Sequence, residues 1–163
     1  MAADVGTNCA SFVSGSAILG AIVGYGLRIW LANQIANRKE DWDRLHKLTD
    51  MVNELVDEAI DFFCIQDTTK DERQKKCIRI QRLIANSGQQ AYSLSTALGA
   101  QQISACQKRL RQSITMDEFD ADVTRAPLAQ SDDRILGIET ACGVLIGVLN
   151  MHYARKYRGS SKA

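Results

Sequence analysis

The most constraining feature of this sequence is an apolar stretch near its start, which contains no charged residue from Val5 to Leu27. Its central part, residues 11–31, is 21 residues long. A helix rises about 1.5 Å per residue, so this length covers a hydrocarbon layer of about 30 Å. The stretch therefore predicts a transmembrane helix over residues 11–31, preceded by a short tail over residues 1–10.

Three residues near the end of this stretch suit a membrane interface. Arg28 can extend its long side chain so that the guanidinium reaches the lipid headgroups. Tyr25 and Trp30 lie close to it in sequence, and aromatic side chains with a polar edge favour the same layer. We therefore expect Tyr25, Arg28 and Trp30 to mark the membrane interface.

The stretch is also rich in small residues. Gly15, Gly20, Gly24 and Gly26 fall within 12 residues, and each glycine costs about 1 kcal/mol relative to alanine in a water-exposed helix. Lipid offers no competing hydrogen bonds, so a membrane helix tolerates them better. Ser16, Gly20 and Gly24 recur every four residues, a stripe that lets another helix approach closely. This spacing predicts a homo-oligomer or a partner membrane protein. For the stretch as a whole, the alternative to a membrane span is a buried helix or a disordered N-terminal arm.

The charges on either side predict the orientation. Only Asp4 precedes the stretch, whereas Arg28, Arg38, Lys39, Arg44 and Lys47 follow it. Basic residues remain on the cytoplasmic side of a membrane. The prediction is a single-pass protein whose N-terminus lies outside and whose remaining chain is cytoplasmic.

The rest of the chain predicts an all-α fold. One proline and 6% aromatic residues are too few for a typical all-β domain. After the span, apolar residues recur at steps of three and four, as on a helix that covers a core; they are Trp42, Leu45, Leu48, Val52, Leu55, Val56, Ala59, Ile60 and Phe63. We expect the transmembrane helix to continue into a small antiparallel helical bundle over residues 32–158, followed by a tail over residues 159–163. The expected helices are about 32–64, 70–98, 101–113, 116–125 and 132–157.

Polar residues and glycine indicate where these helices begin and end. Thr69 with Glu72 fits a capping box, and Thr115 with Glu118 repeats the spacing. Gly99 suits the end of the helix over 70–98. The Ser-Asp-Asp sequence at residues 131–133 suits the start of the last helix.

The last helix has two possible environments. Residues 135–150 carry a single charge, Glu139, and include Gly143 and Gly147 four residues apart. A second membrane span fits the length, but Glu139 would be costly in lipid. We therefore interpret it as a central helix of the bundle, with Gly143 and Gly147 as helix-packing positions and a second span over residues 135–153 as the alternative.

No pattern in the sequence indicates catalysis or cofactor binding. The five cysteines are widely spaced without a C-x-x-C pair, and His46 and His152 have no metal-ligand spacing. Nucleotide-binding glycine motifs and G-x-S-x-G are absent. A formal net charge of +1 and a basic cluster without interleaved aromatics argue against nucleic acid; the cluster is Arg73, Lys75, Lys76, Arg79 and Arg82. We expect no enzyme activity, cofactor, metal or small-molecule substrate.

Three functions remain open at this point. The first is a non-enzymatic membrane-anchored helical protein, an assembly or interaction scaffold that oligomerises through its span. The second is an envelope sensory or lysis-type protein whose helical domain lies outside the cytoplasm. The third is a soluble helical subunit of a larger assembly, such as a virion or a secretion machine, whose glycine-rich segments are buried between protein neighbours.

Overall fold

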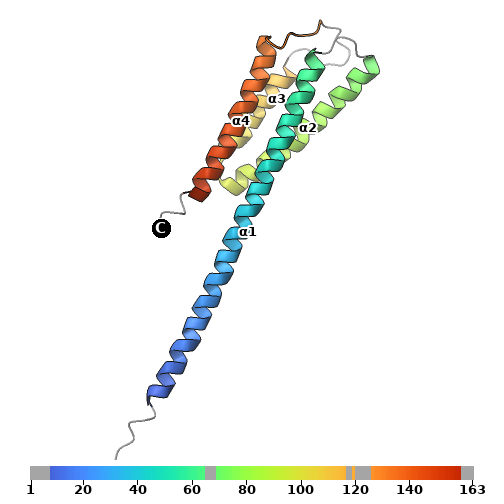
Figure 1. The fold of residues 1–163 in the computed structure, drawn as a ribbon. Helices are drawn as coiled ribbons and strands as arrows, with labels where there is room; N and C mark the ends of the chain where they lie inside the picture. The colour runs from blue at the N-terminus through green and yellow to red at the C-terminus, as the bar shows by residue number, and fades with distance from the viewer. Residues whose placement is uncertain (1–7, 65–68, 117–118, 120–125, 159–163) are drawn as a thin grey trace, which may run out of the picture. The chain divides into compact units, whose positions relative to one another are not determined.

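The computed structural model of the protein describes residues 8–64, 69–116, 119 and 126–158, with side chains described from residue 23 onward. These ranges contain four α-helices, shown in Figure 1: α1 (Asn8–Cys64), α2 (Lys70–Leu98), α3 (Gln101–Thr115) and α4 (Asp133–Arg158). The same ranges contain no strand, which confirms the all-α prediction.

The chain divides inside α1 into two compact units, residues 1–40 and residues 41–163. In the second unit, the C-terminal part of α1 and the helices α2, α3 and α4 run alternately in opposite directions (Figure 1). The short connections from α1 to α2 and from α2 to α3 favour antiparallel neighbours, whereas the connection from α3 to α4, over residues 116–132, is longer. The helical bundle expected from the sequence is therefore present in the second unit.

The bundle core is formed by one apolar face of each helix. The spacing of three and four residues that predicted these faces places them toward a common interior. α1 contributes Leu45, Leu48, Val52, Leu55, Val56, Ala59 and Phe63; α2 contributes Ile80, Ile84, Ala91 and Leu94; α3 contributes Ile103, Leu110 and Ile114; α4 contributes Ile135, Ile138, Cys142, Leu145 and Leu149.

Specific polar contacts define the helix ends. Both hydrogen bonds of the predicted capping box are present at α2, since Glu72 N donates to Thr69 Oγ1 at 3.4 Å and Thr69 N donates to Glu72 Oε2 at 3.2 Å. Gly99 ends α2 with φ of 64°, a left-handed conformation that favours glycine. At the start of α4, the carboxylate of Asp132 accepts a hydrogen bond from Arg134 N at 2.9 Å. These contacts satisfy backbone groups that a helix end otherwise leaves unpaired.

Three details differ from the sequence predictions. Trp42 was expected in the core stripe, but its side chain is 43% exposed and packs against His46 and Tyr153 at the edge of the bundle. Thr115 does not begin a helix, because it is the last residue of α3 and its hydroxyl donates to Arg111 O at 2.9 Å. Of the helix expected over 116–125, Met116 and Phe119 are not helical; residues 117–118 and 120–125 lie outside the described residues, as do the expected tails at residues 1–7 and 159–163.

Candidate interaction surfaces

The first candidate surface belongs to the first unit, residues 1–40. Every residue from Tyr25 to Glu40 is exposed, including the large apolar side chains of Leu27, Trp30 and Ile35, which are 54%, 56% and 69% exposed. Successive residues are about 100° apart around a helix, so apolar side chains at these positions point in several directions. Residues 23–31, in which Arg28 is the one charge, are therefore apolar on several sides, unlike a helix that lies on a protein core, whereas residues 33–40 are mostly polar.

The first unit contains the residues predicted to lie at the membrane interface and those predicted to pack against another helix. Tyr25, Arg28 and Trp30 are exposed on α1. Gly24 has open space where a Cβ would lie. Ser16 and Gly20 belong to α1, but the side chain of Ser16 and the exposure of both residues are not described. The predicted membrane-interface and helix-packing roles of these residues stay predictions.

The second candidate surface is the outer face of α4, opposite its buried face. It carries no charge over about four helical turns and consists of exposed residues, namely Leu136, Gly137, Thr140, Gly143, Val144, Gly147 and Met151. The predicted packing residues Gly143 and Gly147 lie here with open space at their Cβ positions. They face away from the core of their own unit, so any close-packing helix would have to come from elsewhere.

Among the described residues, α4 is also the one helix whose length and apolar composition would allow it to cross a membrane. A core helix of a soluble protein has the same properties. Five of its residues are buried in the bundle, including Ile138, Leu145 and Leu149 with no exposed surface. In the structure, then, α4 is a component of the bundle with one apolar face left uncovered.

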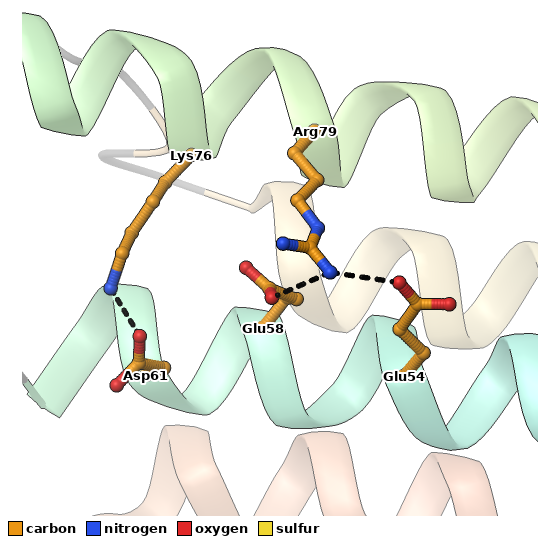
Figure 2. A network of polar contacts seen from close by, with 5 residues as sticks. All are labelled: Glu54, Glu58, Asp61, Lys76 and Arg79. Carbon is orange, nitrogen blue, oxygen red and sulfur yellow. Dashed lines mark hydrogen bonds and ion pairs between the residues drawn. The ribbon is translucent and has the colours of Figure 1, made fainter.

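A network of ion pairs joins α1 and α2 (Figure 2). Arg79 donates to Glu54 at 2.9 Å and lies 3.2 Å from a carboxylate oxygen of Glu58. The hydrogen bond with Glu54, followed by the charge of Glu58, raises the pKa of Arg79. Lys76 pairs with Asp61 one turn away along the same helices. Two members of the predicted basic cluster are therefore engaged with carboxylates of the bundle, which reduces the charge available to an external anion.

A second polar cluster joins α1 to α4 at the start of the bundle segment. Asp41 is only 6% exposed, and it accepts hydrogen bonds from Lys156 at 2.7 Å and from Tyr157 at 2.6 Å. Lys156 also donates to Ala97 O near the end of α2 at 2.8 Å. Burial by itself would raise the pKa of Asp41, but the hydrogen bonds from Lys156 and Tyr157 outweigh it and lower the pKa. This cluster ties three helices together at one end of the bundle.

The histidines and cysteines whose side chains the structure describes do not gather into a metal site. His46 packs edge-on against Trp42, with ring centroids 4.3 Å apart, and His152 lies 3.2 Å from Gln102 Oε1. Within the described ranges, no group of three or more His, Cys, Asp or Glu side chains could hold a metal ion.

The Asp41 cluster and the outer face of α4 differ in how far the sequence indicates them. The Asp41 cluster joins residues more than 100 positions apart, so no local pattern indicates it. The outer face of α4 was indicated by the nearly uncharged sequence of residues 135–150, which is apolar around the helix and not only along one stripe.

No family model, curated protein or solved structure matches this chain, so its function has to be inferred from its own residues.

Proposed function

We propose that the protein is a non-enzymatic, membrane-anchored helical module for assembly, with residues 11–31 crossing a bilayer and residues 41–158 forming its helical domain. The observation that carries this proposal is the exposure of the apolar residues after Val23. Leu27, Ile29 and Leu31 are about half exposed. Leu27 and Leu31 share one side of α1, because they are four residues apart, and Ile29 lies on the opposite side. A helix that is apolar all round is stable in lipid or between protein neighbours, and is unfavourable in water.

The α4 helix remains outside the bilayer in this proposal. It packs side by side with α3, and the exposed Lys108, Arg109 and Arg111 belong to α3. Placing α4 across a membrane would bring those charges into lipid together with Glu139, at a cost of several kcal/mol. The buried face of α4 is satisfied by the bundle, so the single span at residues 11–31 is the favoured arrangement.

Assembly would occur through the small residues of the span. Ser16, Gly20 and Gly24 share one helix stripe, which allows two backbones to approach closely in lipid. The occupant is a second copy of the chain or the span of a partner membrane protein. The outer face of α4, with Gly143 and Gly147, offers a second surface of the same small-residue character.

Fractionation of cells that express the full chain or a chain beginning at Asn37 tests the anchor. We expect the full chain to remain with membranes after carbonate extraction and the shortened chain to be soluble, because the shortened chain lacks residues 11–31. Equal solubility of both chains would overturn the anchor and favour the soluble subunit of a larger assembly.

Thiol labelling in intact cells tests the orientation. Cys64 and Cys106 are partly exposed in the bundle. If basic residues after the span keep the bundle cytoplasmic, a membrane-impermeant maleimide will label these thiols only after the cells are permeabilised. The measurement uses a Cys9→Ser variant, because Cys9 lies in the tail that the proposal places outside and would itself be labelled. Labelling of this variant in intact cells would reverse the orientation and favour an envelope protein with an external helical domain.

A further inference from the structure

A groove between α2 and α3 has features that the assembly function does not use. Its volume is about 740 Å³, within the range of pockets that hold small organic molecules. Ile84, Ala85 and Phe119 give it an apolar lining, and Lys108 and Arg111 add two cationic groups. The groove therefore combines an apolar surface with positive charge, and all of it lies in the second unit.

A buried amide in this groove has an unused hydrogen-bond acceptor. Gln107 is 6% exposed, and its Nε2 donates to Ser87 Oγ at 2.7 Å. Ser87 Oγ itself donates to Ile84 O at 3.2 Å, so the serine can only accept from Gln107, which fixes the orientation of the amide. Gln107 Oε1 is buried and has no partner among the described residues. An unpaired buried acceptor is unfavourable. Because this oxygen has almost no surface exposed to the groove, a ligand with an N–H or O–H donor would satisfy it only by displacing the side chains that cover it.

A glycine keeps the groove open opposite this amide. Gly88 lies in the interior of α2 and lines the groove, although a glycine there costs about 1 kcal/mol relative to alanine. A Cβ at Gly88 would meet no atom within 4 Å, so packing within the bundle does not require the glycine. Its absence of a side chain leaves space that a bound molecule can occupy.

We propose that this groove binds an amphipathic organic anion that carries an N–H or O–H donor. The anionic group pairs with Lys108 and Arg111, the donor bonds Gln107 Oε1, and the apolar body lies over Gly88 and Ile84. Arg111 lies four residues after Gln107 and three after Lys108, so it neighbours both on α3, and all three residues line the groove. Each part of the ligand matches a different feature of the groove, so the proposal requires all three: the anionic group, the hydrogen-bond donor and the apolar body.

The probe for the test is anilinonaphthalene sulfonate, which combines a sulfonate, an aromatic body and one N–H. The full chain in maltoside micelles is titrated by fluorescence, and the signal of protein-free micelles is subtracted. We expect saturable binding of one probe per chain. Gly88→Leu fills the groove and should weaken binding at least about tenfold, while Gln107→Met, which removes the acceptor, should weaken it about fivefold.

Matched controls distinguish the groove from other apolar surfaces. Gly147→Leu makes the same change at another open helix position, on the outer face of α4, and should leave binding unchanged. The melting temperature of each variant shows that it is folded; Gly88→Leu should not lower it, because leucine favours a helix more than glycine does. Double substitution of Lys108 and Arg111 by glutamine should also weaken binding.

Three results would overturn the proposal. The first is unchanged affinity in Gly88→Leu, which would place the probe elsewhere. The second is unchanged affinity in Gln107→Met, which would remove the donor contact. The third is complete displacement of the probe by inorganic phosphate at equal concentration, which would reduce the site to a contact between simple anions and surface cations.

Discussion

The two halves of α1 share one helical backbone but differ in how their apolar residues are distributed. In residues 25–40 every side chain is exposed, and apolar groups occur on several sides. In residues 41–64 the buried residues recur at steps of three and four and form one stripe, with carboxylates, Arg44 and Lys47 between them. The difference shows that the angular distribution of apolar groups, and not helix formation itself, decides which environment each half requires.

Glycine follows the same division. Gly24 and Gly26 lie in the first half, whereas residues 41–64 contain no glycine. A helix that faces water loses stability with each glycine, and a helix in lipid loses less. The composition of the two halves is therefore consistent with lipid around the first and water around the second.

The largest effect is expected from truncating a buried side chain in the second half. Leu48 has no exposed surface, whereas Leu31 is 50% exposed. Leu48→Ala should lower the free energy of unfolding of the bundle by about 2–5 kcal/mol, through lost burial and a residual cavity. Leu31→Ala, the matched control, should leave it unchanged, as measured by denaturant unfolding in the same detergent. Equal losses in both variants would mean that the two halves share one packed environment.

The sequence predicted the core well because a helical core leaves a local periodic pattern. Leu45, Leu48 and Val52 were assigned to the buried stripe, and the structure buries them. Trp42 has the right spacing too, but it lies at the edge of the bundle, where an aromatic ring can cover the core and remain 43% exposed. Periodicity indicates which side of a helix faces inward; it does not indicate where along the helix the core stops.

The candidate surfaces were less predictable than the core. The groove between α2 and α3 depends on which side chains of two different helices face one another, as Ser87 and Gln107 do across 20 residues of sequence. Gly88, in the interior of a long helix, has a cost that needs a reason, but no prediction was drawn from it. The span predicted at residues 11–31 depends on length and scarcity of charge, which are local properties of the sequence, and it stays a prediction.

An intermediate effect is expected at the polar cluster where the second half begins. Asp41→Asn removes the charge that Lys156 and Tyr157 contact, and should cost about 1–3 kcal/mol at neutral pH. The lowered pKa of Asp41 means that its contribution is complete above the ordinary value of 3.8 and is lost as the pH falls through the lowered pKa. Asp43→Asn changes an exposed neighbour and serves as the control.

The pH dependence of unfolding separates this cluster from general acid denaturation. Wild type and Asp43→Asn should lose stability more steeply below the ordinary aspartate pKa than Asp41→Asn does, because only Asp41→Asn lacks the titrating group of the cluster. The raised pKa of Lys156 has the opposite dependence: burial alone would lower it, but Asp41 raises it, so its contribution is lost only in strong alkali. Parallel acid profiles for all three proteins would show that Asp41 does not stabilise the bundle through its charge.

The smallest effect is expected from the ion pairs on the water-facing side of the second half. Arg79 is more than half exposed while it bridges Glu54 and Glu58, and exposed pairs are weakened by water and by salt. Arg79→Met keeps most of the aliphatic side chain, so it should reduce stability less than Asp41→Asn does. The reduction should disappear in about 1 M sodium chloride, where the Debye length is about 3 Å. If the reduction in stability of Arg79→Met persists at high salt, Arg79 stabilises the bundle by packing against α1. The water-facing side of this half would then contribute packing as well as ion pairs.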